Sequence, residues 1–270
     1  MMRNARLVFL ILAGAMVIAA SDAITAQAPS DPSLVYIHAT AFERKGRPVI
    51  GLLSDEFKVF EDNVPQDIAF FSGKNAPITV EILLDVEDTN KDRVKTAATT
   101  GLISGTPGDE IDVAETGKAR LNDAVYQGID KLVHGRNDTR ALILFTTRND
   151  PGDGSFSKVK ELLRHQDVRL YVVGLPTRAD LASDQSRPML KELAEVNGGT
   201  AFFPASIIEV QDIFRKIGKE LRNQYLIGYH PTNAATDGKW RKIKVNAQHA
   251  DKGNVVKFDI HTRTGYYSQK

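Results

Sequence analysis

The chain has 270 residues, with 35 lysines and arginines against 34 aspartates and glutamates, and it has no cysteine. The lack of cysteine excludes disulfide bonds and lipoprotein anchoring, so the fold must rest on its hydrophobic core. A net charge of +1 without a basic block excludes the electrostatic footprint of a nucleic-acid-binding protein. No polybasic amphipathic segment indicates a membrane surface.

The first 26 residues have the layout of a secretory signal peptide. Arg3 and Arg6 precede an apolar run at 7–20, and small residues follow it. The run is shorter than the roughly 18 apolar residues of a spanning helix. We therefore expect cleavage after Ala26, export to the periplasm or the outside, and no membrane span in the mature chain. An uncleaved membrane anchor is the alternative.

Residues 27–75 predict short β-strands. Apolar or alternating stretches at 34–42, 57–62 and 67–71 are typical of strands, and the Gly- and Pro-containing stretch 44–48 indicates a turn. Because a few short strands with one apolar face need a covering layer, this segment is not expected to form a core alone.

Residues 76–222 alternate between buried strands and amphipathic helices. Such alternation predicts a doubly wound α/β domain with helices on both faces of a parallel sheet. Three end signals are expected: Ser157 as a helix cap, Gly198 as a left-handed helix terminus, and a capping box from Ser206 to Glu209. The predicted strands are 78–86, 141–147, 168–175 and 200–204, and the predicted helices are 93–104, 121–133, 157–165, 189–197 and 206–222.

Residues 223–270 return to β-structure, with strands predicted at 224–231, 241–248 and 255–263. We expect these strands to join the N-terminal ones in one small β-sandwich, into which the α/β domain is inserted. Each set then supplies the layer that the other lacks. Trp240 is expected to pack at the end of a hairpin.

An acid-rich stretch directly follows the first buried strand of the α/β domain. Ligands of open α/β sheets bind beyond the carboxyl ends of the strands, and Asp85 stands at such an end. Glu87 and Thr89 would face the same side of the turn, and oxygen ligands of this kind suit Mg²⁺. Asp88 and Asp92 are interpreted as acids near a helix N-terminus, where the helix dipole favours them.

An ordered series of motifs covers residues 34–267. It comprises GRPVIGLLSDEFKVFEDNVPQDIAFFS, PITVEILLDV, PGDEIDV, LNDAVYQGIDKL, ALILFTT, LAEVNGGTAFFP, ELRNQYLIGYHPTN and DGKWRKIKV. The series resembles the VWFA-related family abundant in acidobacteria, whose members carry a von Willebrand factor type A domain. The resemblance implies a Rossmann-like fold, a metal-ion-dependent adhesion site for Mg²⁺ or Mn²⁺, and a protein partner that offers an acid to the metal.

The first motif of that adhesion site, Asp-x-Ser-x-Ser, reads Asp-Val-Glu-Asp-Thr at 85–89. The aspartate, Asp85, matches, and Thr89 keeps a hydroxyl. The first serine has become Glu87. The resemblance therefore implies a metal site that is altered at its first motif.

The other two motifs of the site depart further. The threonine of the second motif corresponds to Ala119, and the aspartate of the third corresponds to Thr147, with Arg148 beside it. Two interpretations stay open: Asp85, Glu87 and Thr89 still hold a metal, or the metal is lost and Arg148 or Lys118 neutralises the acids. We expect the metal to be lost, because a guanidinium binds carboxylates with two parallel hydrogen bonds.

The sequence thus predicts an exported, non-enzymatic binding protein with a protein partner. No Walker loop or Gly-x-Gly-x-x-Gly is present, so a nucleotide cofactor is not expected, and the six histidines lack metal-ligand spacing. The expected contact face consists of Asp85, Glu87, Thr89, Lys118, Thr147 and Arg148.

Two other functions are weighed. Asp85-x-Glu87-x-Thr89 resembles the Asp-x-Asp-x-Thr nucleophile motif of haloacid-dehalogenase-type phosphohydrolases, which require Mg²⁺. That chemistry needs an acid pair after a later strand, whereas the strand at 168–175 leads into Pro-Thr-Arg. The third class is a structural envelope component with no specific partner at this face.

Overall fold

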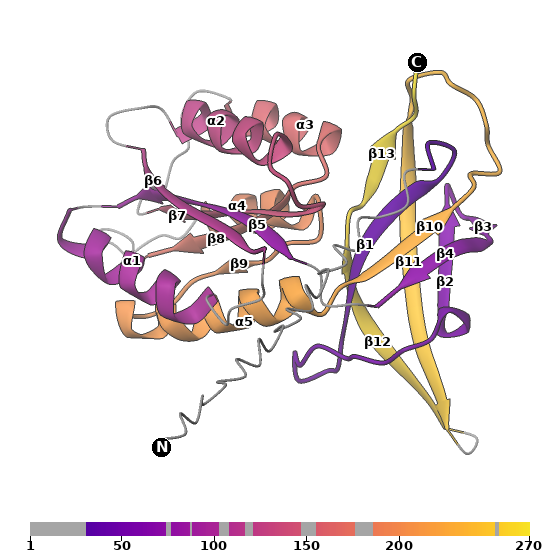
Figure 1. The fold of residues 1–270 in the computed structure, drawn as a ribbon, viewed down its shortest axis with the longest axis horizontal. Coiled ribbons are helices and arrows are strands. Elements are labelled where there is room, and N and C mark those ends of the chain that lie inside the picture. Colours follow the sequence, from indigo (N-terminus) through magenta and orange to yellow (C-terminus); the bar gives the residue numbers. More distant parts are fainter. Residues whose placement is uncertain are drawn as a thin grey trace, which may run out of the picture.

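The computed structural model describes residues 31–73, 77–86, 88–102, 108–116, 121–146, 155–175, 186–251 and 254–270. An α/β unit lies beside a β unit, which is built from strands of both ends of the chain (Figure 1). The predicted signal peptide falls outside the described residues. Within them, no helix has the length and apolar character needed to cross a bilayer.

The α/β unit is a parallel sheet, whose five strands in the described chain lie in the order β6-β5-β7-β8-β9. The strands are β5 (Ile78–Asp85), β6 (Glu110–Glu115), β7 (Thr139–Thr146), β8 (Arg169–Gly174) and β9 (Ala201–Phe202). The helices are α1 (Asp88–Leu102), α2 (Leu121–Val133), α3 (Ser155–His165), α4 (Ser186–Glu195) and α5 (Val210–Arg222). Because β6 and β7 flank β5 on opposite sides, the winding direction reverses between β5 and β7.

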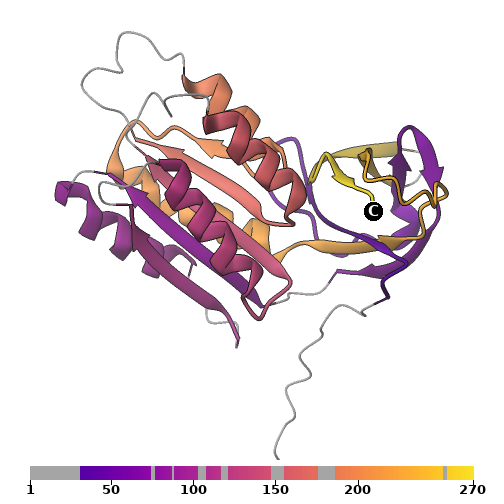
Figure 2. The same cartoon turned by 90° about the horizontal axis from the view of Figure 1, so that it is seen from above.

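Two helical layers bury the sheet. Helices α1 and α5 cover one face, and α2, α3 and α4 cover the other (Figures 1 and 2). All eight residues of β5 are buried, with Ile82 and Leu84 facing α1 and α5 and Leu83 facing the opposite layer. This double burial explains the continuous apolar run in the sequence, and it fixes the end of β5 firmly.

The β unit consists of antiparallel strands that join both ends of the described chain. Its eight described strands are β1 (Val35–Phe42), β2 (Phe57–Glu61), β3 (Val64–Gln66), β4 (Ile68–Ser72), β10 (Tyr225–Tyr229), β11 (Trp240–Asp251), β12 (Asn254–Thr262) and β13 (Gly265–Tyr267). They follow the order β3-β2-β11-β12-β1-β10-β4, and β13 pairs with β11. A short 3₁₀ turn, η1 (Ser54–Glu56), precedes β2.

The sheet of the β unit closes over its own core. The Tyr229 hydroxyl of β10 donates a hydrogen bond to the Glu61 carboxylate of β2 (2.7 Å), although three strands separate β10 from β2 in the sheet. Side chains of β1, β2, β10 and β11 share one buried cluster. The strands of both ends therefore join in one β unit, as expected, but they alternate within one continuous sheet and do not form two separate layers of a sandwich.

Several element ends differ from the sequence predictions. The helix predicted at 121–133 is confirmed, and Gly198 has the expected left-handed φ of 75°. Helix α1 begins at Asp88, earlier than predicted, so Asp88 is its first residue and the exposed Asp92 follows one turn later. Strands β3, β6 and β13 are not among the strands predicted from the sequence.

Two predicted helix caps are wrong. Ser157 lies inside α3, which already begins at Ser155. Ser206 precedes the 3₁₀ turn η2 (Ile207–Glu209), and its side chain makes no capping hydrogen bond. The tighter 3₁₀ geometry displaces the backbone groups that a capping box would bind, and α5 starts only at Val210.

The two units meet at the end of the parallel sheet where its strands begin. Arg169, the first residue of β8, donates hydrogen bonds to Thr40 Oγ1 (3.1 Å) and to the His38 carbonyl oxygen (3.3 Å) of β1. The Val196 carbonyl oxygen accepts hydrogen bonds from the Thr264 amide (3.0 Å) and hydroxyl (3.1 Å). The carboxyl ends of β5 and β7 therefore lie at the end of the sheet away from this junction.

The junction also contains an aromatic contact. The rings of Trp240 and Tyr267 meet edge to face with centroids 5.0 Å apart, and the Arg164 guanidinium lies 5.3 Å from the Trp240 centroid. The Tyr267 ring stacks on His165 of α3 at 4.3 Å. Trp240 is thus the first residue of β11 and packs beside β13 and α3. The prediction that it packs at the end of a hairpin is wrong, because β11 turns into β12 at its other end, at Asp251.

Candidate functional site

Asp85 is the last residue of β5 and stands at the carboxyl end of the sheet, beside the point where the winding reverses. Its side chain is 5% exposed. A buried carboxylate needs hydrogen-bond partners, because an unpaired one would cost several kcal/mol. The strands on either side of β5 supply them.

Two threonine hydroxyls hold the Asp85 carboxylate. The Thr146 hydroxyl, at the end of β7, donates to Oδ2 over 2.8 Å, and the Thr116 hydroxyl, just after β6, lies 3.2 Å from Oδ1. Thr116 also reaches the Leu84 carbonyl oxygen through its amide (3.1 Å). The carboxylate thereby fastens three neighbouring strand ends together.

Of the predicted contact face, the structure places Asp85. Glu87, Lys118, Thr147 and Arg148 lie outside the described residues, as does the side chain of Thr89 in α1. The hypotheses that concern them therefore stay predictions.

Sequence reasoning missed the two threonines that bind Asp85. In the sequence, the pair Thr146-Thr147 ends a predicted strand, and the family motif directed attention to Thr147. The parallel register instead pairs Asp85 with Thr146 across β5 and β7. Aligning the carboxyl ends of the predicted strands would have found Thr146, because residues that end neighbouring parallel strands lie together.

The described donors around Asp85 meet only part of what Mg²⁺ or Mn²⁺ requires. Mg²⁺ takes six oxygen ligands and is usually bound by one or two carboxylates. Asp85, Thr116 and Thr146 offer oxygen only, which fits a hard cation, but they carry a single negative charge. Within the described residues, no three histidine, aspartate or glutamate side chains come together. The donor type therefore fits a metal, whereas the charge and ligand number are low.

The same geometry argues against phosphoryl transfer. A nucleophilic aspartate must reach an incoming phosphorus atom. The Asp85 carboxylate is almost fully buried, and both of its oxygens face threonine hydroxyls. The acid cluster that would complete a Mg²⁺ site is absent from the described part of the chain. A phosphohydrolase is not supported.

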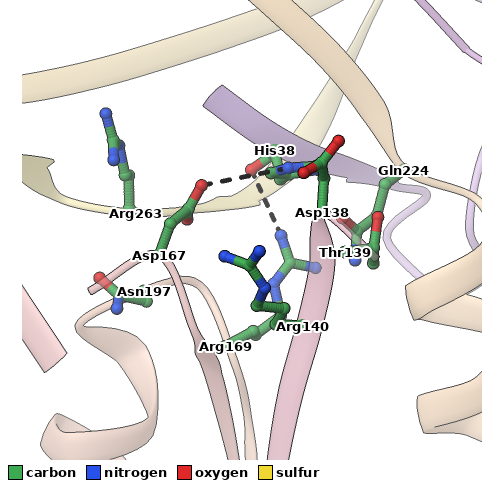
Figure 3. Close-up of a pocket in the computed structure, with 9 residues that line it drawn as sticks. All are labelled: His38, Asp138, Thr139, Arg140, Asp167, Arg169, Asn197, Gln224 and Arg263. Carbon is green, nitrogen blue, oxygen red and sulfur yellow. Dashed lines mark hydrogen bonds and ion pairs between the residues drawn. The ribbon is translucent and has the colours of Figure 1, made fainter. Parts of the chain in front are cut away.

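A second polar site lies in the junction between the units. Figure 3 shows its lining residues, which come from β1, from the beginnings of β7 and β8, and from the segments that follow α4, α5 and β12. They are His38, Asp138, Thr139, Arg140, Asp167, Arg169, Asn197, Gln224 and Arg263.

Arg169 is the most embedded charge of this second site. It is 5% exposed and forms an ion pair with Glu220 of α5 (3.5 Å), which also lies 3.2 Å from His261 Nδ1. Burial lowers the pKa of His38, and the nearby Arg169 guanidinium adds to this effect, while Asp167 at 4.0 Å opposes it. His38 is therefore neutral at pH 7.

The fold and the first site define a class: a doubly wound α/β unit of Rossmann-like topology with an acid at its topological switch point. The sequence profile of the von Willebrand factor type A domain matches residues 40–216, well over half of the chain, from within β1 to within α5. The chain belongs to the von Willebrand factor type A domain family. Domains of this family serve in protein interaction and adhesion. No curated protein matches the chain.

Proposed function

We propose that this chain is an exported, non-catalytic binding protein, and that it contacts a protein partner through the face at the carboxyl ends of β5 and β7. The position of the junction supports the proposal. The β unit packs, through Arg169 and Thr264, on the end of the parallel sheet where its strands begin. The carboxyl-end face thus lies outside the junction. Ligands of open α/β sheets bind at this end, and family membership supports a protein as the ligand.

Asp85 has a positioning role in this proposal. With 5% exposure it offers a partner almost no surface, but it fastens the ends of β5 and β7 and the residue after β6. The loops that leave these strand ends carry the contacts. The contact residues in the proposal are Glu87, Thr89, Lys118, Thr147 and Arg148.

Affinity capture from an envelope extract of the native host tests the face. Immobilised wild-type protein is compared with Asp85→Asn, Arg148→Ala, and the control Asp259→Asn, whose exposed carboxylate lies on β12. We expect recovery of the partner to fall roughly tenfold or more for the first two. Asp85→Asn weakens the contacts that position the loops, and Arg148→Ala removes a contact to a charged group, which contributes about 1.5–3 kcal/mol. The control should recover as much as wild type.

Equal recovery from all four proteins would discredit the face and favour a structural envelope component. Circular dichroism and thermal unfolding of each variant separate loss of binding from loss of fold. Turnover of p-nitrophenyl phosphate with Mg²⁺ that disappears in Asp85→Asn would overturn the non-catalytic part of the proposal.

The partner contact in this proposal does not require a tightly bound metal. The described residues bring one carboxylate, Asp85, to this site, which is the low end of what Mg²⁺ uses, so affinity weaker than micromolar is expected. Isothermal titration with Mg²⁺ and with Mn²⁺ measures it directly. Micromolar binding that is abolished by Asp85→Ala would show that the adhesion site is intact.

Export rests on the N-terminal pattern of Arg3, Arg6 and the apolar run that follows. Expression in a Gram-negative host, fractionation and mass spectrometry of the intact protein test it. The expected product begins at Gln27 and lies in the periplasm or the medium. A full-length chain retained in the membrane fraction would instead support an uncleaved anchor.

A further inference from the structure

The outer face of the β unit carries a group of lysines that the proposed function does not use. Alternate residues of β2 and β11 face the core of the β unit, and the residues between them are turned outward. Strands β2 and β3 lie on the side of the β unit away from the α/β unit (Figure 1). The exposed lysines on this outer side, which define the lysine face, are Lys58 of β2, Lys242 and Lys244 of β11, and Lys257 of β12.

The strand register brings these lysines together. Side chains that are paired across two strands lie about 5 Å apart, and those two residues apart along one strand lie about 7 Å apart. The pairs across the lysine face are Lys244–Phe60, Asn246–Lys58 and Gln248–Lys257. Four positive charges therefore surround the exposed amides of Asn246 and Gln248 and the half-buried ring of Phe60.

Neighbouring acids leave the lysine face with an excess of positive charge. Within the described part of the chain, none of its four lysines forms an ion pair. The acids on the same side of the strands are Asp62, whose Oδ1 accepts the Lys242 amide (2.9 Å), and the exposed Asp259. Four lysines of the α/β unit, by contrast, each contact a carboxylate: Lys91, Lys95, Lys131 and Lys160. A partner with several negative charges would complement the lysine face.

The residue types of the lysine face indicate which partner this is. Protein interfaces are enriched in aromatic residues, methionine and arginine and are depleted of lysine, which is the opposite composition. Surfaces that bind a bilayer place large exposed apolar side chains beside their cations, whereas the central Phe60 is half-buried. The amides of Asn246 and Gln248 offer donors and acceptors that suit hydroxyl groups. Sugar units that carry carboxylates match both the lysines and the amides.

We propose that the lysine face binds an acidic polysaccharide whose sugar units carry carboxylates. The lysines bind the carboxylates, and Asn246 and Gln248 bind hydroxyl groups between them. Because the lysines stand on three strands of one sheet, several of them bind the same polymer chain at once, and their weak single contacts add up to a useful affinity. The lysine face is separate from the carboxyl-end face, so its test does not depend on the protein partner.

Binding of the full chain to polygalacturonate, measured at several salt concentrations, tests the proposal. Wild type is compared with Lys58→Gln/Lys244→Gln and with the control Lys216→Gln/Lys219→Gln, which removes two exposed lysines of α5 and so changes the net charge equally. We expect wild type and the control to bind, more weakly as the salt concentration rises. The Lys58/Lys244 variant should bind at least roughly tenfold more weakly, because half of the local charge is lost.

Three further probes separate the alternatives: neutral dextran, poly-L-aspartate and vesicles of phosphatidylglycerol. We expect each to bind wild type more weakly than polygalacturonate does. The proposal is overturned if polygalacturonate does not bind, if both double variants weaken its binding equally, or if dextran binds as tightly. Tighter binding of poly-L-aspartate that depends on Lys58 and Lys244 would assign the lysine face to an acidic protein segment instead, and the same result with the vesicles would assign it to an anionic bilayer.

Discussion

At the scale of single residues, Asp85 shows how a buried carboxylate at a strand end is held by neighbouring strands. A carboxylate at the end of a fully buried strand must find partners within reach, and the parallel register offers the residues that end the neighbouring strands. Here these partners are Thr116 and Thr146. The carboxylate consequently stabilises the strand ends whether or not a cation or a partner is present.

Thr146→Val tests this role. The variant keeps the shape of the side chain but removes the hydroxyl that donates to Asp85 Oδ2 (2.8 Å). We expect the free energy of unfolding to fall by about 1–3 kcal/mol, because a buried charged acceptor loses a donor. Urea denaturation measures the change. Thr100→Val, at an exposed site on α1, should stay within about 0.5 kcal/mol of wild type.

A second residue-scale prediction concerns Glu81, a carboxylate inside β5 that is 3% exposed. Burial raises its pKa, and Lys131 of α2, with Nζ 2.9 Å from Glu81, opposes the rise. Removing the amine by Lys131→Met should raise the pKa of Glu81 further. We expect a loss of stability of about 1–3 kcal/mol at pH 7, since the ionised acid then lacks its partner.

The pH dependence of that loss has a definite sign. A carboxyl group with a raised pKa in the folded state favours folding most when it is protonated, so stability is lost as the pH rises above 4.5 through the folded pKa. The deficit of Lys131→Met relative to wild type should therefore shrink between pH 7 and pH 4.5. In the double variant with Glu81→Gln, this pH dependence should disappear. A deficit that is constant across this range would show that Lys131 acts by packing alone.

At the scale of elements, the helices and strands whose apolar residues follow a regular pattern were predicted from the sequence. The continuous apolar run of β5 and the amphipathic spacing of α2 indicate their structures directly, because burial on two faces or on one stripe selects the residue types. Gly198 was predictable because few other residues adopt a positive φ. The position of Asp85 at the end of a buried strand was predictable from the apolar run of β5.

Features that arise from contacts between residues far apart in the sequence were not predictable in this way. Strand β13 spans only Gly265–Tyr267, and its pairing with β11 defines it. Thr116 lies in a stretch without periodicity, and its role appears only when β6 pairs with β5. The Arg169–Glu220 pair joins residues that are 51 positions apart, and no local sequence pattern indicates it.

The turn after α4 gives an element-scale prediction. Gly198 has a φ of 75°, and a Cβ there would lie 2.5 Å from the Thr262 amide nitrogen of β12. Gly198→Ala should therefore cost about 2–5 kcal/mol, from the left-handed backbone and from the clash with the β unit. The control Gly46→Ala shares a positive φ of 72° but has open space around it. Chemical denaturation should show the larger loss of unfolding free energy for Gly198→Ala. Equal losses would show that the clash with Thr262 does not contribute.

At the scale of the whole molecule, the two units are held together by buried polar contacts as well as by contacts of aromatic rings. Arg169 of the α/β unit reaches Thr40 and the His38 carbonyl oxygen of the β unit, and its charge is balanced by Glu220. Such a network is costly when incomplete, because each remaining charge stays buried without a partner. The junction should therefore resist partial opening, which keeps the carboxyl-end face in a fixed relation to the β unit.

The last prediction follows from that balance. Arg169→Met removes the guanidinium and leaves Glu220, which is 5% exposed, beside the Nδ1 atom of His261 at 3.2 Å. We expect the free energy of unfolding to fall by about 3–5 kcal/mol, the cost of an uncompensated buried charge. The double variant Arg169→Met/Glu220→Gln should recover part of this loss, because the remaining amide is neutral. If the double variant is less stable than Arg169→Met, the pair does not act as a charge balance, and the hydrogen bonds of Arg169 to β1 must carry the stability of the junction instead.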